Sequence, residues 1–319
     1  MTTAAEIEHA AAALRAGQLV AFPTETVYGL GADATNGSAL RRLYAAKGRP
    51  ADHPVIVHLG EVADLAEWAA EVPEAARLLA GAFWPGPLTL VLRATPRVSR
   101  VATGGLETVG LRVPANPVAL VLLEAFGGGI AAPSANRFGR VSSTTPGAVR
   151  REFGAEVEIV LDGACAVGIE STIVDCTVDE PRVLRPGAIT LEHIGELLGA
   201  RPELGGATRA PGTLATHYAP DARIEIVTAS ELDARIRELD DTSVTFGVIT
   251  FGADHHPVGP TNAVTLATPA SVEEYANVLY STLRKADDLG MDVVLAVAPP
   301  VDGLGVAVMD RLGRAAAAR

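Results

Sequence analysis

Apolar positions along the first two hundred residues follow two different spacings. A spacing of three to four residues predicts helices at 3–16, 38–47, 61–70, 73–82, 117–126, 190–199 and from Thr145–Pro146 onward. Short apolar runs predict strands at 18–22, 54–59, 88–93, 109–113, 130–132, 157–161, 172–176 and 182–185. Because strands often follow strands in this order, we expect an α/β domain with a twisted mixed sheet and no regular βαβ repeat.

This pattern breaks between Gly199 and Pro220, where prolines and glycines interrupt every periodicity. Strands and helices alternate after it, at 223–227, 230–239, 244–249, 270–286, 293–297 and 303–317. Such alternation is typical of a small Rossmann-like parallel sheet with helices on both faces. We therefore expect an N-terminal domain, an interdomain linker and a smaller C-terminal α/β domain, over 1–205, 206–221 and 222–319.

The composition of the chain excludes some classes of protein. The chain has 319 residues, 48% hydrophobic and 20% charged, which is long enough for two cores and too apolar for global disorder. Its 38 acidic residues against 26 Lys and Arg give a net charge of −12, and such a surface repels nucleic acid over long range. Cys165 and Cys176 lack the spacing of a disulfide framework or a metal site, so we expect both to be buried apolar side chains.

Several common signals are missing from the sequence. The first residues show no basic stretch followed by an apolar one, and no apolar run reaches about 18 residues. We therefore expect no signal peptide, no membrane span and a cytoplasmic location. The standard phosphate loop, GxGxxG, HExxH and GxSxG motifs are also missing, as is any Ser-His-Asp or Cys-His arrangement. Any nucleotide site is therefore unconventional, and a protein nucleophile is not expected.

Two polar segments near the N-terminus carry candidate chemistry. Residues 22–31 (FPTETVYGLG) place two hydroxyls, a carboxylate and a phenol after a buried strand, which fits either a capped turn or a ligand site. Lys47 and Arg49 follow a predicted helix in KGRP. A helix C-terminus attracts cations, but it does not explain an arginine fixed by proline beyond the helix. These two residues therefore indicate an anion site.

Further polar groups follow other predicted strands. Ser134 and Asn136 in PSAN fit either a ligand site or an ordinary turn, and the hydroxyls of 142–145 precede a helix N-terminus, which suits an anion. Arg112 lies inside an apolar strand, where a charge is costly unless it meets a structural carboxylate or a substrate carboxylate. Together these residues predict a polar cavity for a small anionic substrate such as a nucleotide.

At these residues the chain resembles a known family. The segments FPTETVYGLG, KGRP, PSAN, GIESTIVD and VLRPG, in this order, resemble the YrdC-like family, and the stretch 210–220 with the following α/β domain resembles its two-domain form, threonylcarbamoyl-AMP synthase. The resemblance implies a YrdC-like N-terminal domain with a large cavity and a Rossmann-like C-terminal domain. It also implies a nucleotidyltransferase that makes threonylcarbamoyl-adenylate and pyrophosphate from L-threonine, bicarbonate or CO2 and ATP, for the N6-threonylcarbamoyladenosine (t6A) modification of tRNA.

The resemblance implies roles for single residues as well. Lys47 and Arg49 are expected to be catalytic, because they stabilise the phosphates. Threonine is expected to bind to Thr26, His58, Arg112, Ala132 and Ser171. ATP is expected to bind to Arg49, His53, Thr108, Ser134, Asn136, Ser142, Arg185, His217 and Tyr218. His53 departs from the family pattern, since many members carry asparagine there.

The implied reaction sets the remaining expectations. Threonine's amine forms a carbamate whose oxygen attacks the α-phosphorus, a step that depends on positioning and charge neutralisation. We expect Mg²⁺ to be held mainly by ATP and water, and the linker with His217 and Tyr218 to act as a lid. The product is expected to pass to a tRNA-modifying threonylcarbamoyl transferase, without a membrane or stable nucleic-acid binding. The alternatives are a YrdC-type RNA-binding module without catalysis and carbamoyl transfer to another acceptor.

Overall fold

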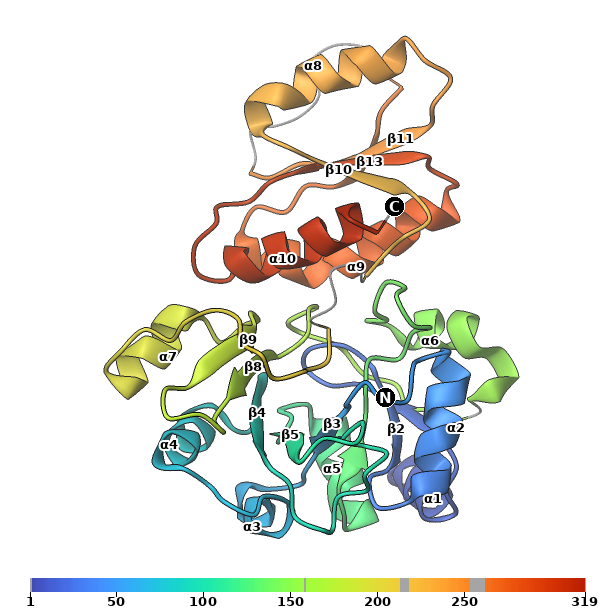
Figure 1. Cartoon of the computed structure of the whole chain (residues 1–319). Helices are drawn as coiled ribbons and strands as arrows, with labels where there is room; N and C mark the ends of the chain where they lie inside the picture. Colours follow the sequence, from blue (N-terminus) through green and yellow to red (C-terminus); the bar gives the residue numbers. More distant parts are fainter. Residues whose placement is uncertain (1, 158, 213–217, 253–261, 319) are drawn as a thin grey trace. The chain divides into compact units, whose positions relative to one another are not determined.

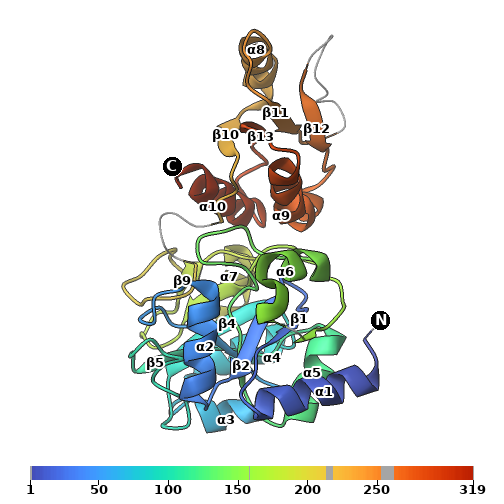
Figure 2. The ribbon, with the colours of Figure 1, turned by 90° about the vertical axis from the view of Figure 1, so that its right-hand side faces the viewer.

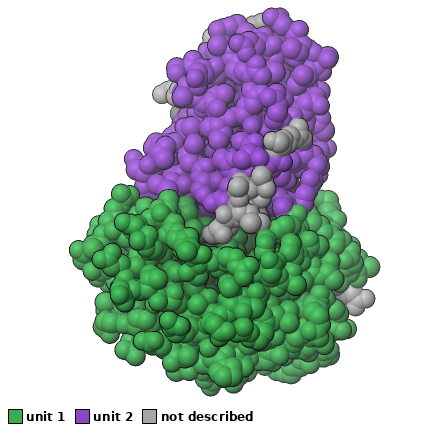
Figure 3. Space-filling model, viewed as in Figure 1, with its two compact units in different colours: residues 1–138, 142–213 green, residues 139–141, 214–319 purple. Residues whose placement is uncertain are grey.

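The chain forms two compact units (Figure 3). The computed structural model describes residues 2–157, 159–212, 218–252 and 262–318. The first unit contains Met1–Phe138 and Ser142–Thr213, and the second contains Gly139–Val141 and Leu214–Arg319. The division near residue 213 falls inside the predicted linker, of which residues 213–217 lie outside the described part of the chain.

The first unit is built around one sheet of nine strands (Figure 1). In sheet order these are β7 (Ile159–Val160), β1 (Val20–Phe22), β2 (Gly29–Asp33), β6 (Ile130–Ala131), β3 (Ile56–His58), β5 (Thr108–Arg112), β4 (Leu88–Arg93), β8 (Thr172–Asp175) and β9 (Arg182–Arg185). Strand β5 pairs parallel with β3 and antiparallel with β4. The predicted mixed sheet is therefore confirmed.

Two large apolar clusters pack on opposite faces of this sheet at β1, and a smaller third cluster contains residues of β3, β4, β8 and β9. Successive strand residues point to opposite faces, and Ala21 of β1 belongs to one cluster whereas its neighbours Val20 and Phe22 belong to the other. The Phe22 cluster includes α1 (Ala4–Arg15) and α5 (Pro117–Phe126). The Ala21 cluster includes α2 (Gly37–Lys47), α3 (Leu65–Trp68), α4 (Glu74–Phe83), α6 (Pro146–Phe153) and α7 (Leu191–Leu198). The helix predicted over 61–70 is instead a 3₁₀ turn, Val62–Asp64, followed by the single turn of α3.

Local chemistry places the candidate site residues. The amide oxygen of Asn36 caps the start of α2, and Gly48 ends the helix in the left-handed conformation (φ 63°), which glycine adopts at little cost. Lys47 is therefore the last helical residue, and Arg49 begins the following loop.

Strand β2 begins within the FPTETVYGLG segment, at Gly29, continues to Asp33, and was not predicted. It pairs antiparallel with β1, with Phe22 opposite Gly29, so residues 23–28 form a hairpin loop. A Cβ on Gly31 would approach Phe22 and Ile130 to 2.8 Å. The glycines of this segment thus permit close packing under an aromatic ring, and they do not mark a turn.

The second unit contains a parallel sheet with helices on both faces (Figures 1 and 2). Its sheet order is β10 (Arg223–Val227), β13 (Val293–Val297), β11 (Phe246–Ile249) and β12 (Val264–Ala267). Helix α8 (Ala229–Asp240) covers one face, and α9 (Val272–Asp288) and α10 (Gly305–Ala316) cover the other. The Rossmann-like prediction is confirmed, although β12, which is largely exposed, was missed. No helix in the described ranges combines the length and apolarity needed to cross a membrane.

Candidate active site

The hairpin loop between β1 and β2 is organised by Thr24. Its hydroxyl lies 2.7 Å from the hydroxyl of Thr26 and donates to the carbonyl of Val27 at 2.7 Å. It also accepts from the amides of Thr26 and Val27. All three residues are buried. The loop is therefore a fixed turn that holds the Thr26 side chain in place.

Arg112, at the carboxyl end of β5, is held by three protein groups. It is 3% exposed, and its Nη1 donates to the Thr26 hydroxyl at 3.0 Å and its Nε to the carbonyl of Gly86 at 3.2 Å. Its Nη2 forms an ion pair with Glu25 Oε1 at 2.6 Å. A guanidinium has five N–H groups, so donors remain for a ligand. The structure thus supplies the structural carboxylate, Glu25, and the substrate carboxylate, the other alternative that the sequence left, stays a prediction.

His58, at the end of β3, lies beside Arg112 in the parallel register. Its Nδ1 is buried and has no hydrogen-bond partner among the described residues. Burial, and then the Arg112 charge, lowers the pKa of His58 to about 3. The ring is therefore neutral near pH 7, and it offers one hydrogen bond and no positive charge. A buried polar atom without a protein partner calls for an explanation, and a bound ligand is one that the predicted threonine site would supply.

Lys47 is enclosed by the PSAN segment. Its Nζ donates to the carbonyl of Ser134 at 2.6 Å and to the carbonyl of Asn136. Burial, and then the Arg49 charge, lowers the pKa of Lys47. The same segment joins the hairpin loop, since Ser134 pairs with Gly29 of β2. The KGRP and PSAN motifs, about 90 residues apart, therefore form one cluster.

Arg49 and His53 share an aromatic neighbour. The Arg49 Nη2 donates to the carbonyl of Pro54 at 2.8 Å, and its guanidinium lies 5.9 Å from the centre of the Phe138 ring. The His53 ring packs edge-on against Phe138 at 5.5 Å. Burial, and then the Arg49 charge, lowers the pKa of His53. His53 is therefore near enough to Arg49 to share a ligand with it.

Ser171 and Arg185 are joined at the edge of the sheet. Arg185 donates to the Ser171 carbonyl at 3.0 and 2.9 Å, to its hydroxyl at 3.1 Å and to the carbonyl of Pro211 at 3.0 Å. The Ser142 hydroxyl donates to Glu170 Oε1 at 2.6 Å. The fourth motif, GIESTIVD, is thus tied to Ser142 and, through Arg185, to Pro211 of the predicted linker.

Each of the remaining predicted site residues has a position of its own in the chain. Thr108 starts β5 and Arg112 ends it, which separates them by about 13 Å along the strand. Ala132 follows β6 and is buried, with its amide donating to the carbonyl of Ile56 at 2.9 Å. Tyr218 belongs to the second unit, where its ring stacks on Tyr280 at 5.6 Å. His217 lies outside the described residues.

The sequence prediction did not name two buried carboxylates, Glu25 and Glu170, as site residues. Each lies within a recognised motif, and each holds a predicted residue: Glu25 holds Arg112, and Glu170 holds Ser142. The composition of the sequence gives further support for Lys47, which was predicted as a catalytic residue. The sequence contains only two lysines, Lys47 and Lys285, so 26 − 2 = 24 of its basic residues are arginines. A chain that otherwise uses arginine and keeps a buried lysine has a reason for the compact ammonium group.

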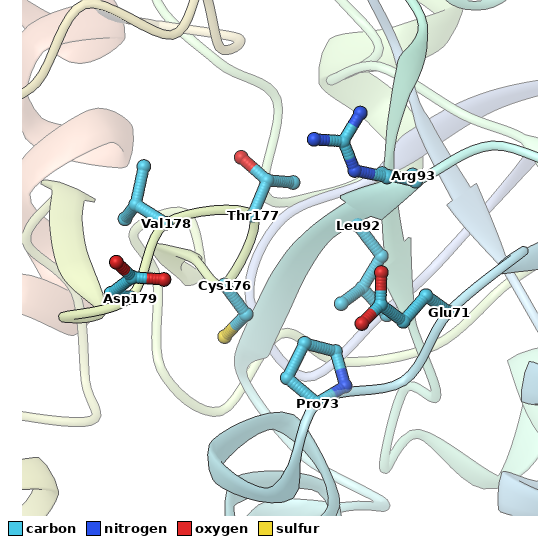
Figure 4. A pocket seen from close by; sticks show the side chains of 8 residues that line it. All are labelled: Glu71, Pro73, Leu92, Arg93, Cys176, Thr177, Val178 and Asp179. Carbon is cyan, nitrogen blue, oxygen red and sulfur yellow. The ribbon is translucent and has the colours of Figure 1, made fainter.

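Other cavities of the first unit are lined by different residues. One of about 380 Å³ (Figure 4) lies between the end of β4 and the residues after β8, where Arg93, Thr177 and Cys176 surround it. Another, of about 920 Å³, is lined by residues that include Glu61, Trp68 and Glu124. Neither contains a predicted substrate residue. The large substrate cavity implied by the resemblance stays a prediction.

The fold and the site define a two-domain α/β protein whose cationic, buried polar site suits a small anionic substrate. Residues 12–187 match the Sua5/YciO/YrdC family model, described as telomere recombination, and residues 189–317 match the model for the threonylcarbamoyl-AMP synthase C-terminal domain. The chain therefore belongs to the Sua5/YciO/YrdC family.

Relatives agree over nearly the whole chain. A threonylcarbamoyl-AMP synthase from Pyrococcus abyssi is 42% identical, with 98% of this chain and 95% of the relative covered. The crystal structure of P. abyssi Sua5 complexed with L-threonine has a TM-score of 0.91 and 41% identity, with 98% and 94% of the two chains covered. A putative threonylcarbamoyl-AMP synthase from Mycobacterium tuberculosis is 43% identical, but covers only 60% of this chain with 89% of its own length.

Proposed function

We propose that this chain is an L-threonylcarbamoyladenylate synthase, which converts L-threonine, bicarbonate or CO2 and ATP into threonylcarbamoyl-adenylate and pyrophosphate for t6A synthesis. One observation carries the proposal: neutral His58 and Arg112 meet at neighbouring strand ends, and the hairpin loop that bonds Arg112 also accepts, at the Tyr28 carbonyl, from the PSAN segment that encloses Lys47. This joins a site for an amino acid to a site for phosphates. The relatives' names favour this function over a non-catalytic RNA-binding module.

The amino-acid end of the site has matching groups. The remaining Arg112 donors pair with the threonine carboxylate, and Thr26 and Ser171 offer hydroxyls. Neutral His58 accepts or donates one hydrogen bond without adding a positive charge, which favours the uncharged amine that must attack CO2. Burial of these residues limits water, and so limits reversal of the carbamate.

The nucleotide end supplies positive charge. The carbamate oxygen attacks the α-phosphorus, and pyrophosphate leaves with the negative charge that develops. Lys47 and Arg49 stabilise this charge. Burial lowers the pKa of Lys47 in the free protein, and the negative phosphates raise it again, because an adjacent anion favours the ammonium form.

Mg²⁺ enters with ATP in this proposal. The described residues contain no group of three or more His, Cys, Asp or Glu side chains placed to hold a metal ion. We infer that ATP oxygens and water supply most of the coordination, which is common for Mg²⁺. The ion neutralises charge on the phosphates during transfer. The product passes to a tRNA-modifying threonylcarbamoyl transferase, and the enzyme works in the cytoplasm.

The test is pyrophosphate release from ATP, with threonine and bicarbonate withheld in turn. Release that requires both supports the proposal, and release without threonine or no release contradicts it. We expect Lys47→Met to lower kcat by about 100-fold or more, as for loss of a charge-stabilising donor. Lys285→Met is the matched control, since Lys285 lies in α9 of the second unit. It should leave release unchanged.

A further inference from the structure

Three residues of the N-terminal half, Gly139–Val141, belong to the second unit. We call them the strap. The Ala219 amide donates to the Gly139 carbonyl at 2.8 Å, and Arg140 forms a parallel bridge with Ala219. The Arg284 guanidinium of α9 donates to the Val141 carbonyl. Backbone and side-chain contacts therefore hold all three residues in the C-terminal unit.

Arg140 connects the strap to Asp221 by a partly exposed ion pair. Its Nη1 and Nη2 lie 2.6 and 2.8 Å from the two carboxylate oxygens of Asp221, a bidentate geometry that fixes direction as well as distance. Asp287 of α9 lies 3.9 Å from Arg140 Nη2. Its other oxygen accepts from the amides of Asp221 and Ala222 at 2.8 and 3.1 Å. The Asp221 backbone is thus fixed to α9 while its side chain holds Arg140.

Directly beside the strap, the chain returns to the candidate active site. On one side, the Phe138 amide donates to the Lys47 carbonyl at 2.7 Å, and the Phe138 ring lies under Arg49. On the other side, the Ser142 hydroxyl binds Glu170, and the Ser143 carbonyl accepts from the Tyr28 amide at 2.9 Å. Along the chain, the strap is therefore flanked on both sides by residues of the first unit that contact candidate site residues.

We propose that the C-terminal unit positions the loop 137–142 for ATP through the strap, with Arg140 as the positioning residue. The proposal rests on the proposed function for its substrate. The M. tuberculosis relative is too short to contain both units in full, because 89% of its length covers 60% of this chain. Because this relative lacks at least part of the second unit, we assign the chemistry to the first unit. The second unit then has the supporting role of orienting a loop.

The first test is kinetic. Arg140→Ala and Asp221→Ala should each raise the KM for ATP about fivefold with little change in kcat, as expected from loss of one partly exposed bidentate pair. The KM for ATP of the double variant should be no higher than that of either single variant, since both substitutions remove the same contact. The charge swap Arg140→Asp with Asp221→Arg should recover part of the loss. Additive losses, or a swap worse than both single variants, would overturn the proposal.

The matched control is Arg150→Ala, which removes an exposed ion pair with Asp162 at 3.3 Å in the first unit. It should leave the KM for ATP unchanged. If Arg140→Ala behaves like this control, the strap does not position the loop and the proposal fails.

The second test needs no activity. Amide hydrogen exchange of peptides covering 137–143, measured without ATP, should be about fivefold faster in Arg140→Ala than in the wild type, and unchanged in Arg150→Ala. Unchanged exchange in Arg140→Ala overturns the strap proposal whatever the enzyme does. A wild type that releases no pyrophosphate with all three substrates instead overturns the proposed function, and exchange still tests the strap.

Discussion

The buried pair of Glu25 and Arg112 gives the sharpest test of the site. Glu25→Gln keeps the shape of the side chain but removes the charge that faces Arg112 Nη2 at 2.6 Å. Both residues are at most 9% exposed, so water cannot replace the lost anion. Removal of one partner from a buried pair costs about 3–5 kcal/mol. Glu25 accepts from the Ala115 amide with its other oxygen at 3.0 Å. Glutamine has a single acceptor oxygen, so its NH2 group must face either the Ala115 amide or the Arg112 guanidinium, which favours the upper end of this range.

This free energy converts into a measurable shift of the melting temperature. For a unit of this size, 1 kcal/mol corresponds to about 2–4 °C, so a loss of about 3–5 kcal/mol should lower the melting temperature of the first unit by about 6–20 °C. Differential scanning calorimetry measures it. Glu67→Gln is the control, because Glu67 pairs with Arg97 at 3.1 Å on the surface. An exposed pair contributes about 0–1 kcal/mol, so this variant should melt within a few degrees of the wild type.

L-Threonine provides a second readout of the same variant. Its carboxylate replaces the missing anion beside Arg112, so saturating threonine should raise the melting temperature of Glu25→Gln more than that of the wild type. An equal melting temperature for Glu25→Gln and the wild type would refute the buried pair. A smaller threonine effect in the variant would refute the assignment of Arg112 to the substrate carboxylate.

Two further predictions concern the core around the site. The pKa of His58 is lowered to about 3 in the folded protein, so between pH 6.5 and 3 only the unfolded state gains this proton and stability falls by about 1.4 kcal/mol per pH unit as the pH drops. His58→Gln should flatten that part of the profile in urea denaturation, whereas exposed His9→Gln should not. Gly31→Ala should destabilise by about 1–3 kcal/mol, because its Cβ would meet Phe22 and Ile130 at 2.8 Å. Gly81→Ala, in open space within α4, should instead stabilise by about 0.5–1 kcal/mol; equal effects of the two would contradict the packing of β2.

Most elements could be read from the sequence because their causes are local. Helix α2 ends at Lys47 because Gly48 closes it, and α6 starts after Thr145 because that hydroxyl accepts from the Ala148 amide. The strands that were not predicted are the glycine-rich β2 and β12, a strand of 4 residues (VTLA) with two exposed positions. The motifs identified the candidate site residues because they place cations and hydroxyls at the ends of predicted strands and helices, where ligand sites are common.

Only the tertiary structure decided which of these residues meet. Arg112 pairs with Glu25 across 87 positions of the chain, and Lys47 donates to Ser134 across the same distance. The strap joins the C-terminal unit although it lies inside the N-terminal sequence. Periodicity and helix caps reflect interactions between residues that are a few positions apart. The contacts of Arg112 and Lys47 depend instead on the order of the strands in the sheet and on the desolvation of buried charges, which makes a close partner necessary. Local pattern and caps therefore predicted most of the elements and the residue types of the site, whereas sheet order and burial in the folded chain decided which side chains became partners.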